Sequence, residues 1–280
     1  MRISEVEAAN ARMLAHAPSV RPVTTKDIIR EHRKKFPYRG YVDIESPYCP
    51  PFVMFCVNDD AVAMDTLWNG TFGYEPGTLG TWSRLAARSA TIADVGAHVG
   101  YFSMIAAHAN PKAKVHSFEP VDQIHSRLSV NVRSNGVQNV KLHQAGVSSK
   151  PGWADISVRF SGNLLSTGST LEGVAADARL QHIQLVTLDE VFADTKLDLV
   201  KIDVEGHEMS VLHGARQVLK RDRPALVIEA LVNAPLDDLF GEFEPLGYDA
   251  HWITEADGTL VPWYEPRPPR TRNLLFAPKD

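Results

Sequence analysis

From residue 91 onward, short apolar runs alternate with longer amphipathic segments. The short runs are typical of buried strands and lie at Thr91–Asp94, Lys114–Phe118, Val140–Gln144, Leu199–Ile202 and Pro224–Ile228. Between them, apolar residues recur at helical spacing, as in the segments Tyr101–Ala109 and Val121–Ser134. Strands that alternate with helices predict an α/β fold. A helix at Leu236–Leu246 and two strands, at Tyr248–Ile253 and Arg272–Ala277, are expected to complete the sheet.

The first 67 residues follow a different pattern. Helices are expected at Ile3–His16 and Thr25–Lys35, and Pro51–Leu67 is expected to form two strands around the turn at residues 58–60. We therefore divide the chain into an N-terminal appendage of helices and a β-hairpin, residues 1–67, and a main domain, residues 68–280. Two interpretations of the appendage stay open. It is either a packing element or dimer contact, which would make a homo-oligomer, or a cap over a substrate entrance.

A glycine-containing turn at residues 95–100 joins an expected strand to an expected helix. Gly96 allows the backbone to pass close under a ligand, and the free N–H groups of the next helix face whatever lies above the turn. His98 stands where the dinucleotide pattern G-x-G-x-x-G has its second glycine, which disfavours a pyrophosphate at this position. Glu119 ends the following strand, where a carboxylate can bind both hydroxyls of a ribose. A ribose ligand without a diphosphate fits S-adenosylmethionine (SAM) better than NAD.

The chain carries four motifs in order: DVGAHVG at residues 94–100, SFEP at 117–120, NVRSNG at 131–136 and VKIDVEGHE at 200–208. In this combination they resemble the motifs of the FkbM family of SAM-dependent methyltransferases, and the similarity covers about residues 68–253. The resemblance implies a Rossmann-like class I methyltransferase fold, with a mixed seven-stranded sheet whose last strand is antiparallel. It also implies methyl transfer, mostly to hydroxyl oxygens of sugars and polyketide-type metabolites. The family usually has Asn where this chain has His98.

Several residues are expected to bind the cofactor. A Tyr-Glu-Pro segment like residues 74–76 approaches the cofactor in the family, so Glu75 is a candidate partner for the ammonium of SAM; its alternative role is to lead into a helix that begins with Pro76. Small residues at 145–147 leave room for a flat adenine, bound through backbone groups. The expected cofactor-binding residues are Glu75, Asp94, Gly96, Ala97, His98, Gly100, Phe102, Glu119, Pro120, Ala145, Gly146 and Val147.

The segment Leu197–Glu208 carries the candidate catalytic residues. Asp203, Glu205 and His207 follow a buried strand, and Glu229 ends the next strand at the same edge of the sheet, where open parallel sheets bind ligands. An alcohol attacks a methyl sulfonium well only if its proton leaves, so His207 and Asp203 are competing candidates for the general base. Asp203 and Glu229 are also candidate ligands of Mg²⁺, and a simple positioning role for these residues stays open.

Two further segments have alternative interpretations. The Ser-, Thr- and Gly-rich residues 160–182 are expected to form a long loop, which we interpret as a substrate lid and alternatively as a solvated excursion. Arg267, Arg270 and Arg272 lie in a Pro-rich segment near the C-terminus, either facing an acidic substrate or forming a solvated loop.

Composition narrows the class of protein. The chain has 280 residues, 44% hydrophobic and 22% charged, with a net charge of −5, which is ordinary for a globular protein and offers no general basic field for nucleic acid. Cys49 and Cys56 are expected to be reduced thiols. The sequence MRISEVEAAN does not resemble a signal peptide, and no apolar run is long enough to span a membrane, so the expected location is the cytoplasm.

Three functions remain open at this point. The favoured one is a SAM-dependent O-methyltransferase that acts on a hydroxyl group of a small glycosylated or polyketide-like natural product, a sugar hydroxyl above all. The second is an NAD-dependent oxidoreductase, although no Tyr-x-x-x-Lys pair stands in a suitable place. The third is a non-catalytic SAM-binding scaffold.

Overall fold

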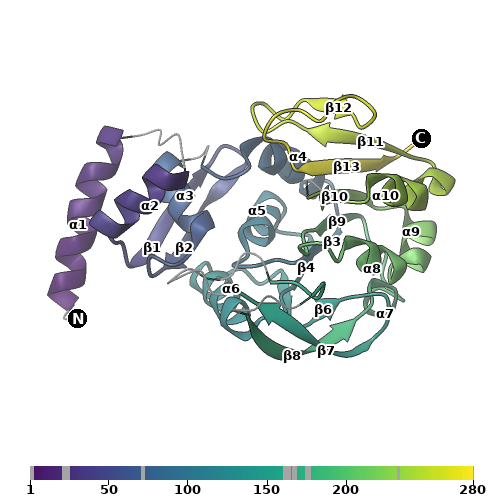
Figure 1. The fold of residues 1–280 in the computed structure, drawn as a ribbon, viewed down its shortest axis with the longest axis horizontal. Helices are drawn as coiled ribbons and strands as arrows, with labels where there is room; N and C mark the ends of the chain where they lie inside the picture. Colours follow the sequence, from purple (N-terminus) through teal and green to yellow (C-terminus); the bar gives the residue numbers. More distant parts are fainter. Residues whose placement is uncertain are drawn as a thin grey trace.

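The computed structural model describes residues 3–20, 26–70, 73–159, 165, 169–173, 178–231 and 234–279. The N-terminal helices lie at one end of the molecule and the sheet with its helices at the other (Figure 1). The helices of the first part of the chain are α1 (Ile3–Val20), α2 (Lys26–Lys35), α3 (Ala61–Asn69), α4 (Pro76–Ala86), α5 (Tyr101–Ala109) and α6 (Asp122–Ser134). The later helices are α7 (Leu188–Val191), α8 (Glu208–His213), α9 (Arg216–Asp222), α10 (Leu236–Phe243) and a 3₁₀ turn (Glu244–Leu246).

A mixed eight-stranded sheet forms the centre of the main domain. In spatial order its strands are β12 (Leu260–Pro262), β11 (Tyr248–Ile253), β13 (Asn273–Pro278), β10 (Ala225–Glu229), β9 (Leu199–Ile202), β3 (Thr91–Val95), β4 (Lys114–Phe118) and β5 (Val140–His143). The strands from β10 to β5 are parallel, whereas β13 runs antiparallel to both of its neighbours. This confirms the predicted seven strands and the antiparallel last strand, and β12 adds a short edge strand that the sequence analysis did not predict.

The sheet is buried on both faces because successive side chains of a strand point in opposite directions. On β9 and β10, Leu199 and Val227 belong to one hydrophobic cluster with residues of α4, α5 and α6. Val200 and Ile228 belong to a second cluster with residues of α8, α9 and α10. The two groups of helices lie on opposite faces of the sheet (Figure 1).

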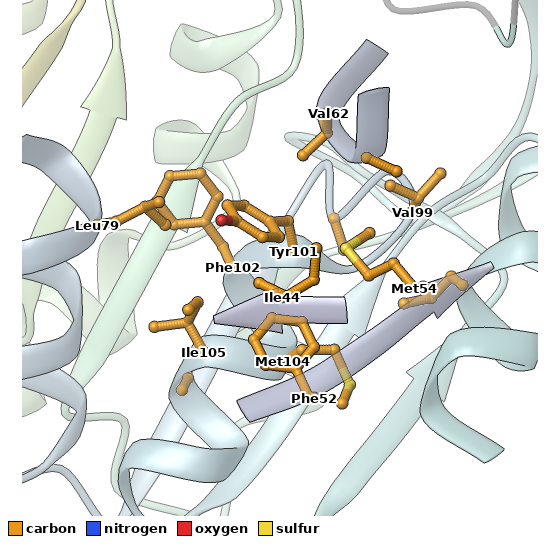
Figure 2. Close-up of a cluster of buried hydrophobic side chains, with 14 of the residues drawn as sticks. Ile44, Phe52, Met54, Val62, Leu79, Val99, Tyr101, Phe102, Met104 and Ile105 are labelled. Atoms are coloured by element: carbon orange, nitrogen blue, oxygen red, sulfur yellow. The ribbon is translucent and has the colours of Figure 1, made fainter. Parts of the chain in front are cut away.

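The N-terminal strands form a hairpin that packs on α5. Strand β1 (Gly40–Ser46) pairs antiparallel with β2 (Cys49–Cys56), and the side chains of Ile44, Phe52 and Met54 lie against Tyr101 and Met104 of α5 (Figure 2). The hairpin therefore shares the hydrophobic core of one face of the sheet. Our division of the chain at residue 67 stays a prediction.

Two asparagines of the NVRSNG motif attach this hairpin to the main domain. Asn131 accepts a hydrogen bond from the Phe55 backbone N–H at 2.8 Å and donates one to the Val99 carbonyl at 2.8 Å. Asn135 accepts from the Val53 N–H and donates to the Val53 carbonyl, both at 2.8 Å. These bonds satisfy backbone groups on the edge of β2 that would otherwise lack partners.

The prediction of two strands within Pro51–Leu67 is wrong in its second half. Residues 61–69 form α3, because Asp60 accepts hydrogen bonds from the N–H groups of Val62 at 2.8 Å and Ala63 at 3.3 Å and so caps a helix. The partner strand of β2 is instead β1, which the sequence analysis did not predict.

A separate three-stranded sheet has the order β6 (Gly146–Val147), β8 (Arg179–Val186) and β7 (Gly152–Val158). Strand β8 begins inside the segment 160–182 that we expected to be a loop. Of that segment, residues 160–164, 166–168 and 174–177 lie outside the described residues. Within the described part of the chain, no helix has the length and apolar character needed to cross a membrane.

Candidate active site

Strand alternation places a row of polar side chains on the α5 face of the sheet. Asp94 pairs in register with Ser117 on β4 and with Lys201 on β9, and Glu229 on β10 pairs with Asn273 on β13. These residues are buried or nearly so, at the carboxyl ends of the parallel strands. Polar and charged side chains therefore line the edge of the sheet at which open α/β sheets bind their ligands.

A cavity of about 1240 Å³ opens above this edge. It is lined by the predicted catalytic residues Asp203, Glu205, His207 and Glu229. It is also lined by the predicted cofactor residues Glu75, Asp94, Gly96, Ala97, His98, Phe102, Glu119, Pro120, Ala145, Gly146 and Val147. Gly100 is the exception, because a Cβ at that position would point at Leu128 on α6, 2.4 Å from its Cδ1, rather than into the cavity.

The glycine turn has left-handed backbone at Gly96 (φ 80°), His98 (φ 50°) and Gly100 (φ 92°). The structure shows a further reason why glycine is required at position 96, which is that a Cβ there would lie 1.8 Å from the backbone oxygen of Asp203. The turn after β3 and the loop after β9 are thus in direct backbone contact. His98 tolerates its left-handed conformation better than most side chains would.

Left-handed backbone at non-glycine residues is concentrated around the cavity. The described residues of this kind are Asn58, Glu75, His98, Glu205, Arg223 and Arg270, and four of them, Glu75, His98, Glu205 and Arg270, line it. Such conformations persist only where surrounding structure imposes them, and they gather at binding and catalytic sites.

Glu119 joins the tip of β4 to the glycine turn. Its carboxylate accepts hydrogen bonds from the backbone N–H of His98 at 3.1 Å and of Val121 at 2.8 Å. Burial raises the pKa of Glu119 to about 7, although the two hydrogen bonds oppose this. Each oxygen keeps a lone pair for one further donor, as binding of two ribose hydroxyls requires.

Asp94 has a supporting place beneath the turn. It accepts a hydrogen bond from the hydroxyl of Ser103 on α5 at 2.5 Å, and the Ser103 and Ser117 hydroxyls lie 2.6 Å apart. Burial raises the pKa of Asp94. This chain of hydrogen bonds fixes α5 against β3 and β4.

Lys201 was not predicted as a site residue. Its ammonium lies 2.6 Å from an oxygen of Asp203 and 4.3 Å from the ring centroid of Phe102, in a fully buried position. Burial alone would lower the pKa of Lys201, but the charges of Asp203, Glu75 and Asp94 raise it. A lysine within an otherwise apolar central strand was the signal available in the sequence, since lysine is almost never fully buried without partners.

Three carboxyl groups meet beside this ammonium. Oxygens of Asp203, Glu205 and Glu229 lie within 4.8 Å of one another. Burial and the charge of Asp203 raise the pKa of Glu229 to about 9. Burial would raise the pKa of Asp203 as well, but Lys201 and a hydrogen bond from Glu229 lower it. The pair thus shares one proton near neutral pH. Burial, then the charge of Asp203, raises the pKa of Glu205 to about 7.

Glu75 faces this acidic cluster while its backbone precedes α4. Its carboxylate accepts a hydrogen bond from Asn273 at 3.1 Å, and burial raises its pKa to about 7. Helix α4 does begin with Pro76, but its N-terminal N–H groups at Gly77 and Thr78 are bound by Glu255 instead. The Glu75 side chain is therefore not used as a helix cap.

His207 has protein partners at both ring nitrogens. Nδ1 lies 2.7 Å from Oε1 of Glu172, and Nε2 lies 3.0 Å from the hydroxyl of Ser148. Glu172 belongs to the described segment 169–173, of which Ser169 and Leu171 line the cavity and Thr170 donates to the Glu205 carbonyl at 3.0 Å. This segment therefore forms part of the wall above the acidic cluster.

Residues 94–249, more than half of the chain, match the family model described as the methyltransferase FkbM domain. The chain belongs to the FkbM methyltransferase family. Members of this family are SAM-dependent methyltransferases, and the sheet order described above is that of class I methyltransferases. The predicted family and fold class are thereby confirmed.

Curated relatives of this FkbM chain include methyltransferase sdnD of Sordaria araneosa, 30% identical over 44% of this chain and 59% of the relative. Methyltransferase 1 of Beauveria bassiana is 26% identical over 44% of this chain and 57% of the relative. The chain thus spans about half the length of each of these two relatives. Among solved structures, a methyltransferase FkbM from Methylobacillus flagellatus KT is similar over 67% of this chain and 43% of its own, with 20% identity and a TM-score of 0.46.

In this FkbM domain, the pairing of β6 with β8 leaves little room for a side chain at Gly146. Gly146 lies on β6, and a Cβ there would lie 2.9 Å from a methyl group of Leu185 on β8. Ala145 and Val147 are buried, and both line the cavity together with Phe118 and Pro120. That these residues receive the adenine ring stays a prediction.

Proposed function

We propose that the protein transfers the methyl group of SAM to a hydroxyl oxygen of a small acceptor, a sugar or polyketide-like metabolite in which a sugar hydroxyl is favoured. The observation that carries this proposal is the cavity that joins the glycine turn and Glu119 to Asp203, Glu205 and Glu229. Methyl transfer to oxygen needs a cofactor site and a proton acceptor in one enclosure.

The charge of the cavity favours SAM over NAD. Its carboxyl-bearing lining residues are Asp65, Glu75, Asp94, Glu119, Asp203, Glu205, Glu229 and Glu255. The basic lining residues are fewer: Arg33, Lys201, Arg270 and Arg272. SAM carries an ammonium and a sulfonium against one carboxylate, whereas NAD carries a diphosphate, so a lining in which acidic residues outnumber basic ones favours SAM. We assign the methionine end to the turn Gly96–His98 near Glu75, the ribose to Glu119 and the adenine to residues 145–147.

Glu205 is the general base in our proposal. Bound SAM supplies an electrophilic methyl group, so the acceptor oxygen forms the new C–O bond while the C–S bond breaks and S-adenosylhomocysteine leaves. Glu205 takes the hydroxyl proton, for which its pKa of about 7 suits neutral conditions. Asp203 is the weaker base, because Lys201 lowers its pKa.

His207 acts as a positioning residue in this scheme. Both of its ring nitrogens lie within hydrogen-bond distance of protein groups, Ser148 and Glu172, so that neither is directed freely toward an acceptor. We propose that it holds the segment 169–173, one of the described parts of the predicted lid, over the site.

We propose that the reaction needs no metal ion. Asp203, Glu205 and Glu229 offer the oxygen ligands that Mg²⁺ prefers. However, the Lys201 ammonium already neutralises Asp203, and the proton on Glu229 would have to leave before a cation could bind. Methyl transfer that is unchanged by a chelator agrees with this proposal, and loss of activity that Mg²⁺ restores contradicts it.

Calorimetric titration with S-adenosylhomocysteine tests the cofactor assignment, with NAD as the control ligand. We expect binding of the homocysteine compound, no binding of NAD and no effect of Mg²⁺. A screen of hydroxylated acceptors with methyl-labelled SAM then tests turnover. Binding without any turnover would favour the scaffold interpretation, and binding of NAD alone would overturn the proposal.

A further inference from the structure

The loop between β12 and β13 carries three arginines, and one of them shapes the loop. Arg267 donates hydrogen bonds to the carbonyls of Thr271 at 2.7 Å, Ala230 at 2.7 Å and Leu231 at 3.3 Å. Its guanidinium also lies 4.8 Å from the ring centroid of Trp252. Arg267 therefore anchors the loop to the end of β10, and its donors are used by the protein itself.

The other two arginines are left on the cavity wall. Thr271 is 2% exposed, whereas Arg270 and Arg272 on either side of it are exposed and line the cavity. Arg270 has left-handed backbone (φ 63°), so the loop is held in an unfavourable conformation at the residue that faces the opening. Among the described residues, no hydrogen bond or ion pair engages its guanidinium.

The positive charge of Arg272 is only weakly neutralised by other groups of the protein. Its Nη1 lies 3.5 Å from Oε1 of Glu229, at the outer limit of a hydrogen bond, and its side chain is 57% exposed. Glu229 is protonated near neutral pH, since burial and Asp203 raise its pKa to about 9, so that it does not neutralise the guanidinium. Among the nearby acidic residues, Glu205 is then the one whose negative charge acts on Arg272.

We propose that Arg270 and Arg272, here called the basic rim, bind an oxyanion that the acceptor itself carries, either a carboxylate or a phosphate. The inference rests on the proposed function and names its substrate class: a hydroxyl compound with a negative charge near the methylated position. Guanidinium forks match the geometry of both oxyanions, and the contact of Arg272 with Glu229 places the rim beside the acidic cluster. An acceptor held there directs its hydroxyl toward Glu205.

Matched sugars test the basic rim without knowledge of the natural acceptor. Glucose, glucuronate and glucose 6-phosphate are titrated by ligand-observed NMR into the full chain loaded with S-adenosylhomocysteine. We expect at least one anionic sugar to bind about tenfold more tightly than glucose, with an affinity that falls as salt rises. The two anions distinguish a carboxylate from a phosphate.

Variants locate the anion on the rim. Arg270→Gln and Arg272→Gln should each weaken binding of the preferred anionic sugar about tenfold and leave glucose unchanged. Arg216→Gln, which alters an exposed arginine paired with Glu242 on α10, should bind like the wild type. Exposed Arg-to-Gln changes should not unfold the protein, and unchanged affinity for S-adenosylhomocysteine verifies this.

Two results would overturn the inference. One is the absence of any preference for the anionic sugars, including no binding at all, and the other is undiminished anion binding in both variants. Either result alongside normal binding of S-adenosylhomocysteine leaves the proposed function standing. Failure to bind S-adenosylhomocysteine instead counts against the proposed function.

Discussion

At the scale of single residues, Lys201 organises the charge of the site. Its ammonium is the cation beside Asp203, and it also balances Glu75 and Asp94. The sequence motif made Asp203, Glu205 and His207 conspicuous as candidates because they follow the strand, whereas Lys201 lies within it. Hydropathy alone treats such a lysine as an interruption of a strand, and only the register of β9 beside β3 reveals its partners.

Replacing Lys201 by methionine removes this cation and leaves carboxylates buried together. We expect the free energy of unfolding to fall by about 3–5 kcal/mol at pH 7. The deficit should shrink at pH 5, where the carboxyl groups bind protons. Urea unfolding at the two pH values measures both effects. Lys220→Met on the exposed face of α9 is the matched control, and equal stability of the two variants would contradict this account.

The pH dependence of methyl transfer tests Glu205 as the base. The pKa of Glu205 is raised to about 7, and only its deprotonated form accepts a proton, so the rate should fall as the pH drops below 7 and level off above it. Glu205→Gln should lower kcat about 100-fold or more and flatten the profile. Because the pKa of Glu119 is also about 7, rates are measured with saturating SAM. A profile that Glu205→Gln leaves unchanged would refute this role.

At the scale of elements, the sequence predicted the main domain better than the appendage. Strands β3, β9 and β10 are short, mostly apolar and buried at nearly every position, and this composition is typical of a parallel strand covered on both faces. Helix α3 was mistaken for a strand because its residues are apolar and follow a turn-like sequence, and the capping role of Asp60 was overlooked. Strand β1 alternates exposed and buried residues, a weaker signal than a continuous run.

The sequence predicted most residues of the candidate site but not the contacts between them. Residues that follow strand ends were found because the fold brings those ends to one edge, which accounts for Glu119, Asp203 and Glu229 in one cavity. The partners Ser148 and Glu172 of His207 come from loops whose paths no periodicity encodes. Such contacts depend on tertiary packing between segments distant in sequence.

Gly96→Ala tests the contact between the two loops. A Cβ at Gly96 would lie 1.8 Å from the Asp203 oxygen, so one loop must move, and we expect affinity for S-adenosylhomocysteine to fall about 100-fold or more. Gly136 is also left-handed (φ 64°) but has nothing within 4 Å of the added Cβ. Gly136→Ala should therefore cost about 1 kcal/mol of stability and no affinity. Equal affinities of the two variants would argue against the contact.

At the scale of the whole molecule, ionisation of buried carboxyl groups destabilises the ligand-free protein above neutral pH. The pKa values of Glu75, Glu119 and Glu205 are raised to about 7 and that of Glu229 to about 9. Near pH 6 the native state therefore holds more protons on these groups than the unfolded state, whose carboxyl groups titrate near their ordinary values.

The unfolding free energy of the ligand-free protein should consequently decrease as pH rises from about 5 to 7, with a further decrease toward pH 9 from Glu229. Below about pH 6.5 this decrease is made shallower by His116 and His143, because burial lowers their pKa values to about 4 and they bind protons mainly in the unfolded state. Thermal unfolding across this range measures the slope. Glu229→Gln should flatten it between pH 7 and 9 and leave the lower part intact. Greater stability of the wild type at pH 9 than at pH 6 would mean that these carboxyl groups are not buried as described.

The backbone contact between Gly96 and Asp203 also bears on how this enzyme could change its acceptor. Because the turn to which we assign the methionine end of SAM rests on the loop that carries the acidic residues, neither loop can change length or direction without disturbing the other. Natural divergence and laboratory evolution of acceptor preference should therefore accumulate elsewhere around the opening. The segment 169–173 and the arginine loop before β13 are the regions to randomise first when a new acceptor is wanted.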